Sequence, residues 1–158
     1  MKVKAMFKIE LPDESATIKL AGMIAQHVKP GQVIALCGDL GTGKTTFTRG
    51  LASRLGVAEE LVNSPTYLLQ QDYVTPSGMI LHHFDVYRLD DPEQFEMLGV
   101  GETFDSDGVS IVEWADRAPD SMPPDAWWFY FSHKKQGNGR MLEMKLPASI
   151  VEKILAEM

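Results

Sequence analysis

Residues 38–45 read Gly-Asp-Leu-Gly-Thr-Gly-Lys-Thr and fit the phosphate-loop pattern G-x-x-x-x-G-K-[ST]. The glycines let the backbone N–H groups point inward and approach phosphate oxygens closely, because no Cβ intervenes. Lys44 supplies a positive charge for the β- and γ-phosphates, and Thr45 offers a hydroxyl to Mg²⁺. The alternative is a glycine-rich turn without a ligand. The apolar run at 33–37 and the helical pattern at 44–55 favour phosphate binding, since a helix N-terminus attracts anions.

A triphosphate site also needs an acid that organises Mg²⁺, and this acid usually ends a neighbouring apolar strand. Asp85 follows the apolar run 79–84, and Glu113 follows the run 109–112. We expect both carboxylates at the edge of the sheet near the loop, with at least one of them meeting the metal. The alternative for each is a solvated carboxylate at a strand end.

His83 lies two residues before Asp85, so the two side chains share a face of the expected strand. A zinc site is an alternative interpretation, but the chain has only Cys37 and four histidines to supply nitrogen and sulfur ligands. We therefore expect His83 to be a hydrogen-bonding neighbour of the acidic cluster.

The segment Ser64-Pro65-Thr66 follows the phosphate-loop helix and combines two hydroxyls with a stiff proline. In nucleotide switches, a threonine from this region senses the γ-phosphate and the metal. An ordinary β-turn explains the same residues equally well, and both interpretations stay open from the residues alone.

The composition is that of a folded protein rather than a disordered one: 44% of the 158 residues are hydrophobic and 23% are charged. The net charge of −7 argues against tight, unaided binding of DNA or RNA. A local basic patch of Lys134, Lys135 and Arg140 is the exception to consider, although a solvated hairpin tip is the favoured alternative. The single cysteine, Cys37, excludes a disulfide within the chain and is expected to be a buried small hydrophobe.

Targeting signals are not evident in the sequence. The first fifteen residues resemble neither a signal peptide nor a transit peptide. Apolar runs stay well below the roughly 18 residues of a membrane span. We expect a cytoplasmic protein without a membrane partner.

The hydrophobic patterns predict the elements that must position these residues. Strands are expected at 3–9, 33–37, 67–73, 79–84, 109–114, 127–133 and 140–146, and helices at 12–28, 44–55, 92–99 and 148–158. Helices are too few to separate every pair of strands. The predicted fold is therefore α/β: a P-loop NTPase-like three-layer fold around a mixed sheet of about seven strands, parallel at the phosphate loop and antiparallel toward one side. Residues 1–158 are expected to form a single P-loop ATPase domain.

The base of the nucleotide is expected to be adenine. Guanine-binding proteins generally carry an Asn-Lys-x-Asp element, which the sequence lacks. Residues 105–108 do spell D-x-x-G, but they precede the strand at 109–114 instead of ending one, so a turn is the better interpretation.

Several motifs in this order resemble the TsaE family, also called YjeE. They are LPDESAT (11–17), GDLGTGKTTFTRG (38–50), NSPTY (63–67), HFDVYRL (83–89) and VEW (112–114). The family comprises small bacterial ATPases of tRNA threonylcarbamoyladenosine biosynthesis, and the resemblance spans nearly the whole chain. The phosphate loop alone is generic, whereas this combination of motifs is specific.

The resemblance implies roles for individual residues. Lys44, Asp85 and Glu113 would be catalytic, Thr45 and Glu113 would bind Mg²⁺ with Asp85 as a further candidate, and Trp114 would pack beside the site. Ser64-Pro65-Thr66 would be the switch-like segment. The implied ATP-binding set is Glu14, Gly38, Asp39, Leu40, Gly41, Thr42, Gly43, Lys44, Thr45, Thr46, Gly139 and Arg140. Thr42 stands where alanine is common in the family.

The resemblance also implies a function. Such proteins act with TsaD-like and TsaB-like partners that modify adenosine 37 of tRNA, and they hydrolyse ATP to reset that assembly. The cofactors would be ATP and Mg²⁺, and tRNA would be contacted indirectly through the partners. We expect a slow ATPase that a partner stimulates. Arg88 and Arg117 are candidate arginine fingers or, equally, surface ion-pair residues.

Two other functions remain alternatives. A small-molecule P-loop kinase is the main one, although the chain lacks an insertion long enough for a full lid. A non-enzymatic nucleotide-binding module is the third possible function.

Overall fold

The computed structural model describes residues 4–65 and 69–158. Its strands are β1 (Lys4–Leu11), β2 (Val33–Gly38), β3 (Gln70–Val74), β4 (Ile80–Asp85), β5 (Val109–Glu113), β6 (Trp127–His133) and β7 (Arg140–Pro147). Its α-helices are α1 (Glu14–Ala25), α2 (Lys44–Arg54), α3 (Pro92–Glu96), α4 (Val100–Phe104) and α5 (Ala148–Glu157). Short 3-10 turns are η1 (Glu59–Leu61), η2 (Ala115–Arg117) and η3 (Pro119–Ser121).

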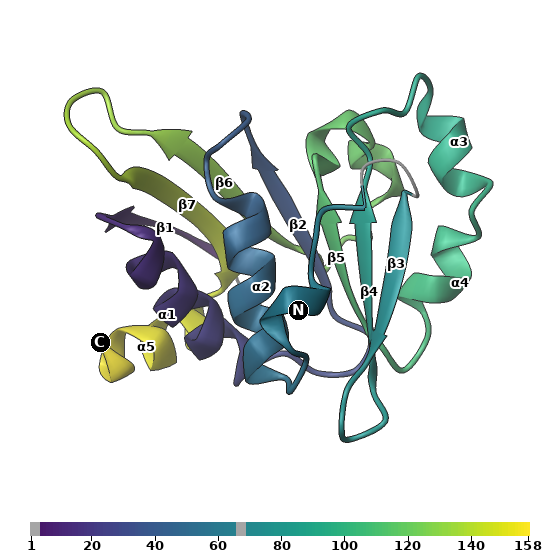
Figure 1. The fold of residues 1–158 in the computed structure, drawn as a ribbon, viewed down its shortest axis with the longest axis horizontal. Coiled ribbons are helices and arrows are strands. Elements are labelled where there is room, and N and C mark those ends of the chain that lie inside the picture. The colour runs from purple at the N-terminus through teal and green to yellow at the C-terminus, as the bar shows by residue number, and fades with distance from the viewer. Residues whose placement is uncertain (1–3, 66–68) are drawn as a thin grey trace.

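The seven strands form one sheet in the order β1-β7-β6-β2-β5-β4-β3 (Figure 1). The central strands β6, β2, β5 and β4 run parallel. Strands β7 and β1 at one edge and β3 at the other run antiparallel to their neighbours. The predicted mixed sheet of seven strands is confirmed. The antiparallel strands lie at both edges instead of one, because the turn at 75–78 folds β3 and β4 into a hairpin.

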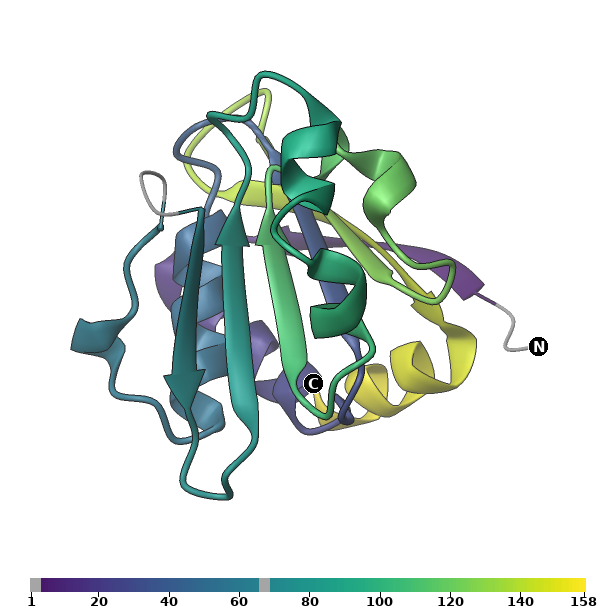
Figure 2. The same cartoon turned by 90° about the vertical axis from the view of Figure 1, so that its right-hand side faces the viewer.

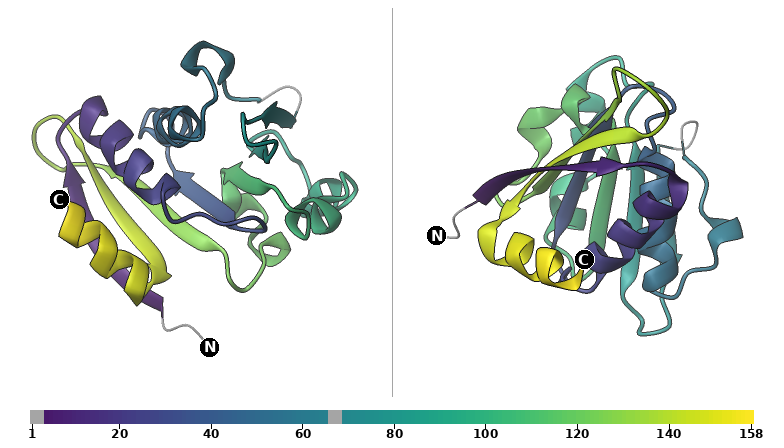
Figure 3. Two further views of the ribbon diagram at one scale, coloured as in Figure 1. Left: turned by 90° about the horizontal axis from the view of Figure 1, so that it is seen from below. Right: turned by 90° about the vertical axis from the view of Figure 1, so that its left-hand side faces the viewer.

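Buried side chains form a cluster on each face of the sheet. One cluster joins α1, α2 and α5 to the strands through residues such as Ile24, Leu51 and Ile154. The other packs α3 and α4 on the opposite face, with Phe95 and Phe104 against the strands. Figure 2 shows α3 and α4 in front of β5 with α1 and α2 behind the sheet, and Figure 3 shows α1 and α2 side by side. The helices therefore form two outer layers around the sheet.

The helical part differs from the sequence prediction in one place. The helix expected from Pro92 to near Gly99 is present as α3, which ends at Glu96, but a second helix, α4, follows it and was not predicted. Gly99 separates them with a φ of 76°, a left-handed conformation that interrupts the helical path. Residue 67, the expected start of β3, and residue 3, the expected start of β1, lie outside the described residues. In the described part of the chain, none of the helices combines the length and the apolar character that a bilayer crossing requires.

The parallel strands β2, β5 and β4 bring their carboxyl ends to one edge of the sheet. Asp85 and Glu113 are register partners there. The phosphate loop leaves β2 at the same edge and leads into α2. Ligands of open parallel sheets bind at this edge, outside the carboxyl ends of the strands.

Candidate functional site

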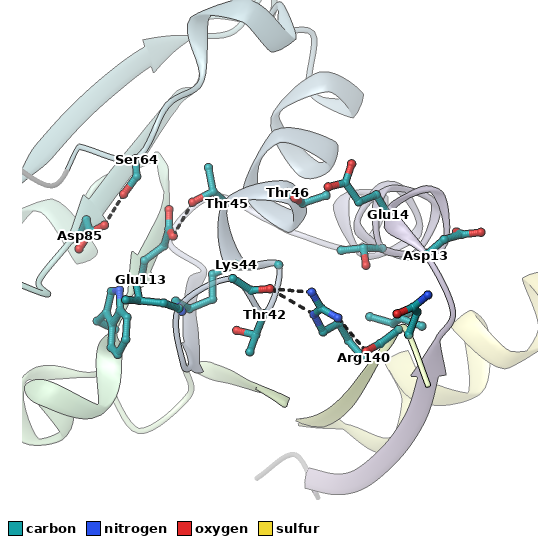
Figure 4. A pocket seen from close by; sticks show the side chains of 18 of the residues that line it. Asp13, Glu14, Thr42, Lys44, Thr45, Thr46, Ser64, Asp85, Glu113 and Arg140 are labelled. Carbon is teal, nitrogen blue, oxygen red and sulfur yellow. Dashed lines mark hydrogen bonds between the residues drawn. The ribbon is translucent and has the colours of Figure 1, made fainter. Parts of the chain in front are cut away.

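A cavity of about 800 Å³ opens at the carboxyl ends of the parallel strands (Figure 4). Its walls come from the start of α1, the loop before α2, the ends of β4 and β5, and the turn that enters β7. The site residues expected from the sequence that line it are Glu14, Leu40, Gly41, Thr42, Gly43, Lys44, Thr45, Thr46, Ser64, Asp85, Glu113, Gly139 and Arg140. The volume is within the range of small-molecule sites, about 300–1,000 Å³.

Three of the expected site residues do not line this cavity, and a fourth lies outside the described residues. Gly38 and Asp39 do not line it, but their carbonyl groups hold the Lys44 side chain. Pro65 is buried and also lies outside the lining. Thr66 falls outside the described residues.

The backbone of the phosphate loop requires glycine at its first position. Gly38 has a φ of 147°, in the region that side chains rarely adopt. A Cβ on Gly38 would lie 2.6 Å from the carbonyl oxygen of Phe131 and 2.8 Å from the Thr42 hydroxyl. Thr42 in turn donates a 2.7 Å hydrogen bond to the carbonyl oxygen of Asp39. The Thr42 hydroxyl therefore points into the loop backbone and closes its turn.

The Lys44 side chain folds back over the loop. Its ammonium group donates hydrogen bonds to the carbonyl oxygens of Gly38, at 2.5 Å, and Asp39, at 2.8 Å. The same nitrogen lies 4.1 Å from the centre of the Trp114 ring, a cation–π distance. Burial lowers the pKa of Lys44 below its usual value, although the nearby carboxylates, Glu113 foremost, oppose this shift. Lys44 is thus a partly desolvated cation held by neutral carbonyls, poised for an anion.

Thr45 and Glu113 meet at the mouth of the loop. The Thr45 hydroxyl donates a 2.9 Å hydrogen bond to Oε1 of Glu113. The other oxygen, Oε2, lies 2.5 Å from Nε2 of His83, and Nδ1 of His83 lies 3.4 Å from the Tyr73 hydroxyl. The expectation that His83 neighbours the acidic cluster is therefore confirmed.

Asp85 contacts the segment that the sequence marked as switch-like. Its Oδ2 accepts a short hydrogen bond from the Ser64 hydroxyl, and its Oδ1 accepts one of 2.9 Å from the backbone N–H of Tyr87. The carboxylate is buried, with 2% exposed. The fold thus gives the two strand-end acids different neighbours: Glu113 faces Thr45, and Asp85 faces Ser64.

The opposite wall of the cavity is formed by residues distant in sequence. Nε and Nη2 of Arg140 both donate to the carbonyl oxygen of Gly41, at 3.2 and 2.9 Å. Glu14, at the start of α1, lies beside Thr46 across the cavity from Asp85 (Figure 4). The turn before β7 and the start of α1 therefore close over the phosphate loop.

The donor chemistry at the mouth of the loop fits Mg²⁺. Thr45 and Glu113 supply oxygen ligands, which this ion prefers, and Mg²⁺ commonly takes one or two protein ligands and completes its shell with phosphates and water. Among the described residues, no cluster of three or more His, Cys, Asp or Glu side chains could hold a metal. Thr45 and Glu113 could therefore hold a Mg²⁺ ion whose remaining ligands are phosphate and water oxygens.

Sequence reasoning missed several residues at the site. The remaining lining residues are Leu11, Pro12, Asp13, Thr17, Tyr87, Trp114 and Asn138, of which Trp114 was expected beside the site. The motif LPDESAT already contained the first four, but it nominated Glu14 alone. Arg117, a candidate finger, lies outside this lining, 4.9 Å from the Tyr87 ring. Lys134, from the candidate basic patch, is paired with Glu10, as a solvated hairpin would allow.

Comparisons with known proteins agree with one another. Residues 11–142 match the model of the family described as "Threonylcarbamoyl adenosine biosynthesis protein TsaE". The chain is 36% identical to the Haemophilus influenzae protein named TsaE, over 72% of this chain and 73% of that one. It is 43% identical to the Bacillus subtilis protein of the same name, over 72% and 68% of the two chains. The crystal structure of Bacillus subtilis YdiB superposes with a TM-score of 0.76 and 28% identity, covering 99% of this chain and 96% of that one.

Proposed function

The chain belongs to the TsaE family of tRNA threonylcarbamoyladenosine biosynthesis proteins, and from this membership and its site we propose that it is a Mg²⁺-dependent ATPase. One observation carries the proposal: the Thr45 hydroxyl and the Glu113 carboxylate meet 2.9 Å apart beside Lys44, at the mouth of a phosphate loop. Phosphoryl transfer depends mainly on positioning and on neutralising charge, and these groups are suited to both.

The phosphate loop and Lys44 would bind the polyphosphate tail. Lys44 would exchange the carbonyls of Gly38 and Asp39 for phosphate oxygens, which are anionic and form stronger hydrogen bonds. Mg²⁺, held by Thr45 and Glu113, would neutralise part of the charge that develops on the phosphates. The backbone N–H groups at the start of α2 would add their partial positive charge.

The water that attacks the γ-phosphorus would be oriented from the β4 side of the cavity. Asp85 lines the cavity, and the Ser64 hydroxyl and the Tyr87 N–H both donate to its carboxylate. Both of its oxygens are thereby held in place, so the carboxylate can accept a hydrogen bond from a water in a defined direction. We assign Asp85 this orienting role and leave the metal to Glu113 and Thr45.

In the cell, the ATPase would serve tRNA threonylcarbamoyladenosine modification as an accessory subunit. Its partners would be TsaD-like and TsaB-like proteins, which would also make the contacts to tRNA, in keeping with a net charge of −7. Turnover would be slow for the isolated chain and faster in the assembly. The proposal includes a cytoplasmic location and a single ATPase domain over residues 1–158.

Product analysis by ³¹P NMR tests the proposal directly. The purified chain with Mg·ATP should give ADP and inorganic phosphate, faster when the partners are added. Lys44→Ala should bind ATP on the order of a hundredfold more weakly, because it removes a charge-assisted contact to the phosphates. Phosphate transfer to an added alcohol would support a small-molecule kinase instead, and binding without turnover in the complete assembly would leave a nucleotide-binding module.

A further inference from the structure

A chain of buried hydrogen bonds leads from Glu113 away from the cavity, through His83 to Tyr73. His83 is fully buried, and Tyr73 is 6% exposed. We propose that His83 and Tyr73 are positioning residues that orient the Glu113 carboxylate toward Thr45 and couple it to the segment 62–65. The inference rests on the proposed function, since it assigns Glu113 its metal-binding orientation.

The direction of the hydrogen bonds follows from the chemistry of the three groups. A carboxylate accepts hydrogen bonds, so Nε2 of His83 carries the proton that is shared with Glu113. In the neutral imidazole, Nδ1 is then the acceptor, and the Tyr73 hydroxyl donates to it. A single tautomer of His83, with the proton on Nε2, therefore satisfies both hydrogen bonds, because each donor then faces an acceptor.

Glu113 needs such support because its side chain has several rotatable bonds and ends a strand. Oε1 receives the Thr45 hydroxyl, and Oε2 receives His83, so the two oxygens are held on opposite sides. Partners that orient a metal ligand in this way typically change metal affinity by about 10–100-fold when they are removed. Without His83, Glu113 would lose the partner that fixes the rotation of its carboxylate.

The same chain reaches the segment that precedes β3. The Tyr73 hydroxyl also forms a hydrogen bond with the backbone of Asn63. Burial raises the pKa of Tyr73, and the hydrogen bond with Asn63 partly lowers it again. Arg49 of α2 donates a 2.9 Å hydrogen bond to the carbonyl oxygen of Val62, and Ser64 donates to Asp85. Segment 62–65 is thus tied to the helix after the phosphate loop and to both acids. A change in the contacts of Glu113 can reach this segment through two buried side chains.

The test compares variants of His83 and Tyr73 by nucleotide binding. A fluorescent, non-hydrolysable ATP analogue is titrated in EDTA and again with increasing Mg²⁺. In His83→Leu, the Mg²⁺ concentration for half-maximal enhancement should rise about tenfold, while the affinity in EDTA should stay within about twofold, because the loop and Lys44 are untouched. His83→Gln should respond to Mg²⁺ nearly as the wild type does, since its amide N–H can donate to Glu113. Tyr73→Phe, which removes one hydroxyl, should give an intermediate shift.

The matched control is His82→Leu. His82 is the neighbouring buried histidine on β4, but its ring bonds to Asp72 at 2.9 Å and alternates to the other face. This variant should keep the wild-type Mg²⁺ dependence, which separates the proposed role from a general effect of removing a histidine.

The possible outcomes separate the two proposals. If Mg²⁺ enhances binding in the wild type but His83→Leu and Tyr73→Phe respond equally to it, the positioning role is wrong and the ATPase proposal stands. Equal losses in EDTA and in Mg²⁺ would also overturn the positioning role, since they indicate general damage to the site. A wild type without any Mg²⁺ enhancement and without hydrolysis would contradict both. Should His83→Leu not fold, Tyr73→Phe decides the question.

Discussion

The Thr45 hydroxyl donates a hydrogen bond to Glu113 although the two residues are 68 positions apart in the chain. Thr45 is the last residue of the phosphate-loop motif and lies in the first turn of α2, and Glu113 ends β5, the parallel neighbour of β2. The pair brings a neutral and an anionic oxygen to the point where the phosphate tail would enter. The predictions below test this arrangement and its surroundings.

Glu113→Gln should lower Mg²⁺-dependent ATP hydrolysis by on the order of a hundredfold, because it removes the negative charge that would hold the metal. The amide keeps the size of the side chain and can still accept from Thr45. Nucleotide affinity in EDTA should therefore stay close to that of the wild type. Steady-state phosphate release and a binding titration measure the two effects, and undiminished hydrolysis would contradict the metal-binding role.

Nucleotide affinity should fall as the pH rises toward the pKa of Lys44, because phosphate binding requires the charged ammonium. Burial places this pKa below the usual lysine value of 10.5, so the decrease should begin at a lower pH than for an exposed lysine. Between the lower pKa of Lys44 in the folded protein and its usual value in the unfolded chain, the unfolded chain binds more protons. The cost of burying the ammonium therefore decreases, and the free energy of unfolding rises, as the pH increases through this range. Titrations with an ATP analogue from pH 8 upward check the first effect. Lys44→Arg is the control: any binding that it retains should not decline over this range.

Trp114 should report nucleotide binding by fluorescence. The Lys44 ammonium lies 4.1 Å from its ring centre, and the Tyr87 ring packs at 4.7 Å from the same side chain. Binding of a polyphosphate would draw Lys44 away from the indole and change its emission. The change should saturate with ATP analogue and be lost in Trp114→Phe, which retains Trp127 and Trp128. A full signal in Trp114→Phe would mean that another tryptophan senses the nucleotide.

Arg140→Ala should weaken nucleotide binding about five- to tenfold. It removes two hydrogen bonds to the Gly41 carbonyl, and a half-exposed contact of this kind contributes roughly 1–1.5 kcal/mol. Arg140→Lys should not restore the affinity, because a single ammonium cannot reproduce the fork of the guanidinium. Isothermal titration calorimetry with an ATP analogue measures the affinities of these variants. Lys135→Ala, which changes an exposed residue of the same hairpin, is the control and should leave binding unchanged.

Cys37 should resist alkylation in the folded protein. Burial is the main cause that raises its pKa to about 12, so the thiolate is scarce near neutral pH, and the side chain is 4% exposed. Iodoacetamide at pH 8, followed by mass spectrometry, should label the native chain slowly and the urea-unfolded chain quickly. Rapid labelling of the native chain would place Cys37 in a more open environment than the one described.

Much of the site could be predicted from local patterns in the sequence. The phosphate loop is contiguous, so its glycines, Lys44 and Thr45 are recognisable by spacing alone. Asp85 and Glu113 were marked as candidates because each follows an apolar run, and the runs also predicted the seven strands. The helix α4 was missed, because five residues are too few for short-range periodicity to identify a helix.

The sequence by itself determined the candidate residues of this protein: a phosphate-loop motif, two strand-end acids and the strands and helices that carry them. The tertiary structure decided which acid faces which partner, with Thr45 meeting Glu113 and Ser64 meeting Asp85. It also brought Arg140 to Gly41 and placed Tyr73 behind His83. These pairings depend on strand order and register, which arise from hydrogen bonds between distant segments, and a pattern of neighbouring residues contains no information about which distant strand lies alongside.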